Sequence, residues 1–142
     1  MLDKIFFDSN ILIYAYSIDE QKKQKMVQDL LNRHEIIIIS TQTVNEFINA
    51  TVRKKILSHV QIAAVVDELF SVFRVEIIDQ SVIKRAVALA TKYHYSYFDS
   101  LMLSSALTSD CSILYSEDMH HTHNVENKLK IINPFVNRVV DS

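Results

Sequence analysis

The stretch Lys4–Asn10, KIFFDSN, sets a short, mostly apolar run directly before three polar residues. The same pattern recurs at Ile36–Thr41, where four isoleucines precede a serine and a threonine. Apolar runs of this length, closed by turn-forming residues, are typical of parallel strands that are buried on both faces. Residues 75–78 and 112–115 repeat the pattern, and residues 130–132 form a weaker candidate. The sequence therefore predicts a central sheet of about five strands.

Segments long enough to form helices separate these strands. Apolar side chains recur every three or four residues in 44–51, 62–73 and 82–90, which is the spacing of one helix face. Strands that alternate with helices predict an α/β fold, in which helices cover both faces of a parallel sheet. No repeat or linker interrupts the 142 residues, and a chain of this size can bury one core. We therefore expect a single domain over residues 1–142.

Composition narrows the class of protein. The hydrophobic fraction of 49% and the charged fraction of 23% are those of an ordinary globular protein, and no apolar run is long enough for a bilayer span. The start, Met1–Lys4, lacks the basic flank of a signal peptide, so we expect a cytoplasmic protein with no membrane partner. The net charge is −2, so any contact with nucleic acid must be local. Glycine is absent, which excludes glycine-rich phosphate loops and leaves the turns to Asn, Asp, Ser and His.

Acidic residues stand where the predicted strands end. Asp8 follows the first strand and Asp118 follows the strand at 112–115. In a parallel sheet these carboxyl ends share one edge, where ligands bind. Glu46 lies in the first turns of the helix that leaves the second strand, on the face opposite the apolar stripe of that helix. We expect these three carboxylates to face one cleft.

Asp99 is expected at the same edge of the sheet because of the direction of the helix that carries it. Two helical segments, at about 80–93 and 97–108, precede the strand at 112–115. Because only a short loop joins the second helix to that strand, the helix must run antiparallel to the strand and begin at its carboxyl edge. Asp99, in the first turn of this helix, is therefore expected beside Asp8 and Asp118.

Four carboxylates from four segments repel one another, and their burial is costly without a counter-charge. A divalent cation would supply that charge, and ligation by oxygen alone favours Mg²⁺ or Mn²⁺ over zinc. A structural interpretation of each acid stays open. Ser96-x-x-Asp99 and Thr43-x-x-Glu46 match the capping-box pattern, and Asp8 could cap the helix that follows it. The residues alone thus predict an acidic metal site and do not choose its substrate.

Four motifs, in this order, resemble a known family. They are Phe6–Leu12 (FFDSNIL), Val44–Phe47 (VNEF), Tyr97–Leu101 (YFDSL), which Met102–Leu107 continues with small and apolar residues, and Leu114–Met119 (LYSEDM). Together they are similar to the motifs of PIN-domain ribonucleases, and among these to the VapC-like toxins of type II toxin–antitoxin systems. The resemblance covers nearly the whole chain.

The resemblance implies a three-layer α/β sandwich with strand order 3-2-1-4-5, metal-dependent endoribonuclease activity on RNA, an antitoxin partner and a homodimer. It implies Mg²⁺ as the cofactor, with Mn²⁺ as a substitute. One departure bears on Asp118: relatives often have glycine soon after the Glu-Asp-Met stretch, whereas this chain continues with His120–Asn124. Carried over by position, the catalytic acids would be Asp8, Glu46, Asp99 and Asp118, the metal ligands Asp8, Asp99 and Asp118, and the supporting polar groups Ser9, Asn10 and Ser116.

Two other functions remain open. Asp8 could be the nucleophile of a phosphatase similar to the haloacid-dehalogenase enzymes, although these have a second aspartate two positions later, where this chain has Asn10. The chain could also be a PIN-like interaction module without catalysis.

Each of four further segments has both a structural and a functional interpretation. Arg53–Lys55 could bind phosphates or be a solvated helix end, and we leave it out of the site. Tyr93–Tyr97 could stack bases or pack in the core or a subunit interface. His120–His123 is expected to be a polar loop rather than a metal site. Val60–Phe73 is apolar on more than one face, so we expect an antitoxin or a second copy to cover part of it.

Overall fold

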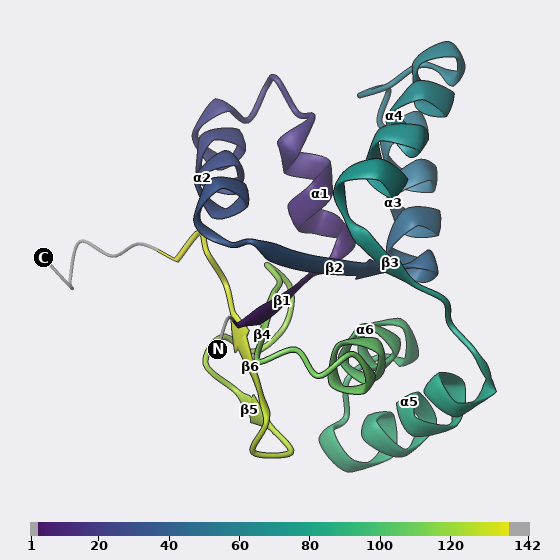
Figure 1. The fold of residues 1–142 in the computed structure, drawn as a ribbon, viewed down its shortest axis with the longest axis vertical. Coiled ribbons are helices and arrows are strands. Elements are labelled where there is room, and N and C mark those ends of the chain that lie inside the picture. Colours follow the sequence, from purple (N-terminus) through teal and green to yellow (C-terminus); the bar gives the residue numbers. More distant parts are fainter. Residues whose placement is uncertain (1–2, 137–142) are drawn as a thin grey trace, which may run out of the picture.

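A six-stranded sheet lies between two layers of helices in the computed structural model, which describes residues 3–136 (Figure 1). The expected domain of residues 1–142 thus includes 1–2 and 137–142, which lie outside the described residues. The elements, in chain order, are β1 (Lys4–Phe7), α1 (Ser9–Ala15), α2 (Gln21–Arg33), β2 (Ile36–Ser40), α3 (Thr41–Arg53), α4 (His59–Val72), β3 (Arg74–Glu76), α5 (Gln80–Tyr93), α6 (Tyr97–Thr108), β4 (Ile113–Tyr115), β5 (Asn124–Val125) and β6 (Leu129–Ile132).

The strands follow the order β3-β2-β1-β4-β6-β5. At the centre, β1 pairs in parallel with β2, where Ile5 lies opposite Ile37, and with β4, where Ile5 lies opposite Ile113. β3 and β6 extend the sheet in parallel, and β5 pairs antiparallel with β6. The implied order 3-2-1-4-5 is confirmed for the five parallel strands, with β6 in the fifth place. β5 was not expected, because a strand of two residues has no periodicity that a sequence could show.

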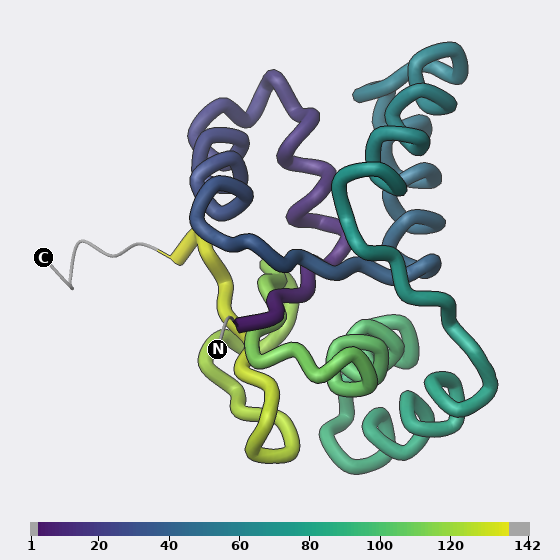
Figure 2. Tube along the Cα trace, in the orientation of Figure 1, coloured from purple at the N-terminus to yellow at the C-terminus, as the bar shows by residue number. Residues whose placement is uncertain are grey.

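Side chains along β1 point alternately to the two faces of the sheet, so successive residues pack against different helical layers. Ile5 and Phe7 pack against α1 to α4, whereas Phe6, between them, packs in the core under α5 and α6. The helices as far as α4 all lie on one side of the sheet, and the chain crosses to the other side only after β3 (Figure 2). The predicted sandwich is confirmed, as are the two helices expected at 80–93 and 97–108. Within residues 3–136, none of the helices is both long and apolar enough to cross a bilayer.

Turns without glycine put ordinary residues into the left-handed backbone region. His94, Asp110 and Asn127 do so, as expected for these residue types. Lys55, Thr122 and Glu126 also have positive φ, so the expectation that Asn, Asp, Ser and His make every turn is wrong. Backbone bonds hold the unexpected residues in place: Lys55 N donates to Val52 O, and Thr122 N donates to Ile131 O at 2.7 Å.

Thr122→Gly is expected to stabilise the protein by about 1 kcal/mol, because a β-branched residue at φ 71° is strained and glycine is not. The Thr122 side chain is exposed, so its removal costs little packing. Thermal unfolding measures the effect. Thr91→Gly, an exposed position within α5, is the matched control and should lower stability by about 0.3 to 0.5 kcal/mol. Equal destabilisation by both substitutions would contradict the strain argument.

Candidate active site

Asp8 is the most deeply placed of the four expected acids. It directly follows β1, caps α1, and is only 4% exposed. Its Oδ1 accepts a hydrogen bond from the backbone N–H of Ser9 at 2.7 Å, and its Oδ2 accepts one from Ser116 Oγ at 2.8 Å. Asp8 therefore does cap its helix, yet its second oxygen is held from another strand end, which capping does not require.

Ser9 joins Asp8 to Glu46. Its hydroxyl donates to Glu46 Oε1 at 2.9 Å and lies 3.5 Å from Asp8 Oδ1. On the other side, Gln42 Nε2 donates to Glu46 Oε2 at 3.1 Å. The capping box of α3 is made by Ser40 and Thr43, not by Thr43 and Glu46. The capping interpretation of Glu46 is therefore wrong, and its carboxylate is free to face the edge of the sheet.

Ser116 and Asn10 connect Asp8 to Asp118. Ser116 is fully buried, and its Oγ accepts a hydrogen bond from the backbone N–H of Asp118 at 3.3 Å while donating to Asp8. Asn10 Nδ2 donates to Asp118 Oδ2 at 3.0 Å. All three residues named as supporting polar groups thus contact the acids. The exposed side chain of Asp118 lies where the motif placed it, before the loop of histidines.

Asp99 enters from the opposite layer. It lies in the first turn of α6, where its backbone N–H donates to Ser96 Oγ at 3.1 Å. The Ser96 side chain also interacts with the Asp99 carboxylate, which lowers the pKa of that group. The charges of Asp118 and Glu46 both act on that carboxylate. The structure therefore brings the four acids into one neighbourhood.

Burial and mutual repulsion make ionisation of this group costly. Burial raises the pKa of Asp8 from 3.8 to about 7, the hydrogen bonds from Ser116 and Ser9 oppose the rise, and the charges of Glu46 and Asp99 add to it. The pKa of Asp99 is also raised, chiefly by burial; a hydrogen bond from the Ser96 side chain opposes the rise, and the charges of Asp118 and Glu46 add to it. None of the four forms an ion pair with another described residue.

The donor set suits a hard divalent cation. The converging donors are carboxylate oxygens, which Mg²⁺ and Mn²⁺ prefer, and Asp8 is a buried acid without a positive partner among the described residues. Within residues 3–136, no three His, Cys, Asp or Glu side chains lie close enough to make a complete metal site unaided. The acids are therefore neighbours rather than a closed ligand set.

The structure also shows supporting residues that the sequence did not reveal. Gln42 precedes Glu46 by one helical turn, a spacing that could have identified it. Lys23 Nζ lies 2.5 Å from Glu117 Oε2, and Tyr14 donates to Glu117 Oε1 at 2.7 Å. This triad holds the residue before Asp118, but its members lie too far apart in sequence to form a motif.

The histidine loop bonds to its surroundings. His123 Nδ1 lies 2.8 Å from the Tyr95 hydroxyl, and His121 Nδ1 accepts a hydrogen bond from Asn133 N at 2.9 Å. Tyr95 also stacks on His123, with ring centres 5.8 Å apart. These contacts favour the expected polar loop and give Tyr95 a packing role.

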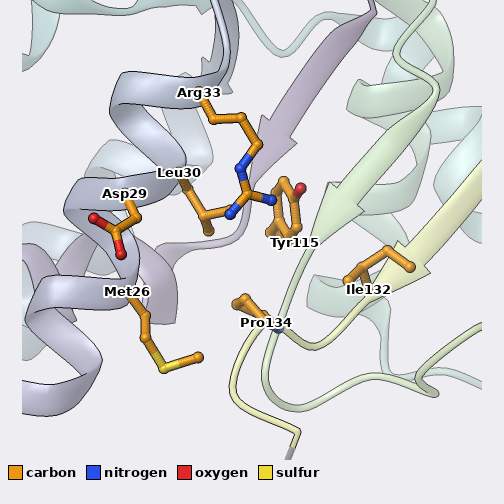
Figure 3. Close-up of a pocket in the computed structure, with 7 residues that line it drawn as sticks. All are labelled: Met26, Asp29, Leu30, Arg33, Tyr115, Ile132 and Pro134. Carbon is orange, nitrogen blue, oxygen red and sulfur yellow. The ribbon is translucent and has the colours of Figure 1, made fainter. Parts of the chain in front are cut away.

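A separate hollow lies between α2 and the ends of β4 and β6 (Figure 3). Its volume is about 280 Å³, and Arg33 and Tyr115 contribute to its wall. None of the four acids lines it. The acidic edge is therefore the better candidate for chemistry.

Comparison with known proteins tests the resemblance. The PIN domain family model matches residues 5–125, a span that contains the four acids and the sheet from β1 to β5. The chain belongs to the PIN-domain family. The predicted family is thereby confirmed.

Among curated proteins, this PIN domain is similar to Ribonuclease VapC2 of Methanocaldococcus jannaschii. The two are 30% identical over 115 residues, which cover 72% of this chain and 76% of the relative.

Solved structures share the PIN fold. VapC20 of Mycobacterium tuberculosis, a toxin that cleaves the sarcin-ricin loop, superposes with a TM-score of 0.69 at 16% identity, over 81% of this chain and 90% of that one. A toxin–antitoxin complex from Klebsiella pneumoniae gives a TM-score of 0.69 at 20% identity, over 93% and 98% of the two chains. At these identities the likeness establishes the fold.

Proposed function

We propose that this PIN-domain protein is a divalent-metal-dependent endoribonuclease and the toxin of a toxin–antitoxin pair. One observation carries the proposal: four carboxylates from both helical layers are neighbours at the carboxyl edge of the sheet, and none is paired with a cationic side chain in the part of the chain that is described. The similarity to Ribonuclease VapC2 supports RNA as the substrate.

Asp8, Asp99 and Asp118 are the proposed metal ligands, and Mg²⁺ is the proposed ion, with Mn²⁺ as a substitute. The bound cation would polarise a phosphodiester oxygen and lower the pKa of an attacking water. Hydrogen bonds from Ser9 and Ser116 to Asp8, and from Asn10 to Asp118, orient the ligands.

Glu46 is the proposed proton acceptor. Ser9 and Gln42 each donate to one of its oxygens, which fixes the carboxylate beside Asp8 without burying it. Water attacks the phosphorus and gives its proton to Glu46, while the 3′-oxygen of the preceding nucleotide leaves and takes up a proton from solvent. The products are a 5′-phosphate and a 3′-hydroxyl, and the 2′-hydroxyl takes no part in the reaction.

An antitoxin is the proposed protein partner, and a homodimer the proposed assembly. Solved structures with this fold include toxin–antitoxin complexes from Klebsiella pneumoniae, and from Salmonella typhimurium with bound DNA. On α4 the side chains of Val60, Phe70 and Val72 are 87%, 52% and 64% exposed, which fits the expectation that a partner covers part of this helix. We place the protein in the cytoplasm, where its proposed RNA substrate is found.

Removal of divalent metal is expected to abolish RNA cleavage, because the acids cannot hold the scissile phosphate without a cation. Purified protein, free of antitoxin, is incubated with total cellular RNA and Mg²⁺, and the cut ends are mapped by sequencing. EDTA should stop the reaction, and excess Mg²⁺ should restore it. Asp99→Asn, with the fold checked by circular dichroism, should be inactive under all conditions.

The chemistry of the ends separates the alternatives. Ends with a 2′,3′-cyclic phosphate would contradict attack by water. If folded, metal-binding protein leaves RNA intact but hydrolyses a simple phosphate monoester, Asp8 is the nucleophile of a phosphatase. If it does neither, a non-catalytic interaction module is the better description.

A further inference from the structure

A second hollow adjoins the candidate active site. It has a volume of about 340 Å³ and lies between α1, the end of α3 and the loop that carries Asp118. Asn10 and Asp118, which are hydrogen-bonded to each other, line one side. Lys54 and Ile56, directly after α3, line the other. A nucleic-acid strand whose scissile phosphate lies at the acids can therefore continue into this hollow.

Besides Lys54, the charged residues that line this hollow are the acids Glu20, Glu117 and Asp118, and of these Glu117 is paired with Lys23. Burial raises the pKa of Glu117, but hydrogen bonds from Lys23 and Tyr14 lower it more, and the net change is downward. The hydrogen bond to Glu117 likewise raises the pKa of Lys23. Glu117 and Lys23 thus form a neutral pair, so the Lys23 charge is not free for a ligand.

Lys54 is the basic residue among those that line this hollow. Its side chain is exposed, and its ammonium forms neither an ion pair nor a hydrogen bond with any residue in 3–136. The backbone around it is nevertheless fixed, because Lys54 N donates to Ala50 O at 2.9 Å and Ile56 N donates to Thr51 O at 2.8 Å. Lys54 therefore presents a positive charge without an ion-pair partner from an anchored position in the wall of the hollow, where it also acts on Glu117.

We propose that Lys54 binds an RNA phosphate next to the scissile one, and that the hollow receives the nucleotide between them. This inference rests on the proposed ribonuclease function and assigns a substrate contact to a residue that the sequence left outside the site. Four carboxylates repel a polyanion, and the net charge of −2 supplies no general attraction, so a local cation is needed on the path of the strand. Ile13, Tyr14 and Ile56 add apolar surface for the sugar or base.

Lys54→Gln is expected to weaken RNA binding about fivefold, because one charge-assisted phosphate contact is lost. Binding is measured in Mg²⁺ by fluorescence anisotropy with a labelled single-stranded RNA of mixed sequence on the Glu46→Gln background, which slows cleavage and keeps the proposed metal ligands. The slope of log affinity against log salt should fall by about 0.7, the value for one phosphate contact on a single strand. In the cleavage-competent protein, KM should rise while kcat changes by less than about twofold.

Lys55→Gln is the matched control, because Lys55 has the same charge and is adjacent but does not line this hollow. It should change affinity by less than about twofold, and Lys54→Arg should restore binding. Equal loss in both glutamine variants, or an unchanged salt slope in Lys54→Gln, would overturn the assignment. If the Glu46→Gln protein does not bind RNA at all in Mg²⁺, the Lys54 contact is refuted. If wild-type protein does not cleave RNA, the proposed function fails separately.

Discussion

Asp8→Asn is expected to reduce RNA cleavage about a thousandfold or more, while making the metal-free protein more stable at neutral pH. Activity falls because an amide is a poor ligand for Mg²⁺. Stability rises because the substitution removes a carboxylate that is 4% exposed and lies near the charges of Glu46 and Asp99. Asparagine keeps the acceptor for Ser9 N and is itself a good helix cap, so the local structure is retained.

The gain in stability of Asp8→Asn over the wild type should increase as pH rises. The pKa of Asp8 rises from 3.8 in the unfolded chain to about 7 in the fold. The folded state therefore holds this proton more tightly, and the resulting stabilisation is fully present below about pH 4 and lost as pH rises through 7. Between pH 5 and pH 8 the wild type should lose about 2 to 4 kcal/mol relative to Asp8→Asn.

Chemical denaturation in EDTA at a series of pH values measures this difference. Asp118→Asn is the control, since Asp118 is exposed, and its free energy of unfolding should stay within about 1 kcal/mol of wild type at each pH. Saturating Mg²⁺ should then stabilise the wild type and not Asp8→Asn. A pH-independent difference between wild type and Asp8→Asn would show that the cost of ionising Asp8 is not the cause.

Glu46→Gln is expected to lower kcat by about two to four orders of magnitude while leaving metal binding in place, because Glu46 is the proposed proton acceptor and not a ligand. The side chains are nearly isosteric, and the bond from Ser9 can be kept by the amide oxygen. Single-turnover cleavage gives the rate, and Mg²⁺-dependent thermal stabilisation gives the metal affinity.

The contrast with Asp99→Asn tests the division of roles. Asp99→Asn should lose both cleavage and stabilisation by Mg²⁺, whereas Glu46→Gln should lose cleavage alone. If Glu46→Gln also loses the response to Mg²⁺, Glu46 is a metal ligand. If it retains nearly full activity, water is activated by another group.

Much of the acidic edge could be predicted because it depends on topology. Asp8 and Asp118 end parallel strands, and the short connection from α6 to β4 leaves one direction for that helix, so Asp99 had to begin at the same edge. The resemblance supplied the strand order 3-2-1-4-5, which the sheet confirms for its five parallel strands. Motif spacing predicted the location of a residue correctly where that location depends on its position along its own strand or helix.

Local sequence patterns gave wrong predictions where the same residues fit two different local structures. Thr43-x-x-Glu46 matches a capping box, yet Ser40 begins the helix three residues earlier and takes Thr43 as its partner. The sequence is compatible with either capping box. Because β2 ends at Ser40, the helix begins directly after that residue and Ser40 is its cap. Likewise, the absence of glycine did not restrict left-handed turns to Asn, Asp, Ser and His, because backbone bonds hold Lys55 and Thr122 there.

The sequence by itself determined the class of fold, the family and the edge at which the acids stand, because these depend on strand punctuation and helix period, which are local. Only the tertiary structure decided which groups touch: that Ser9 bridges Asp8 and Glu46, and that Lys23 neutralises Glu117 and so leaves Lys54 without an ion-pair partner, among the described residues, in the hollow that Asp118 also lines. Such contacts join residues tens of positions apart. Their geometry depends on how closely packed layers meet, which no spacing along the chain encodes.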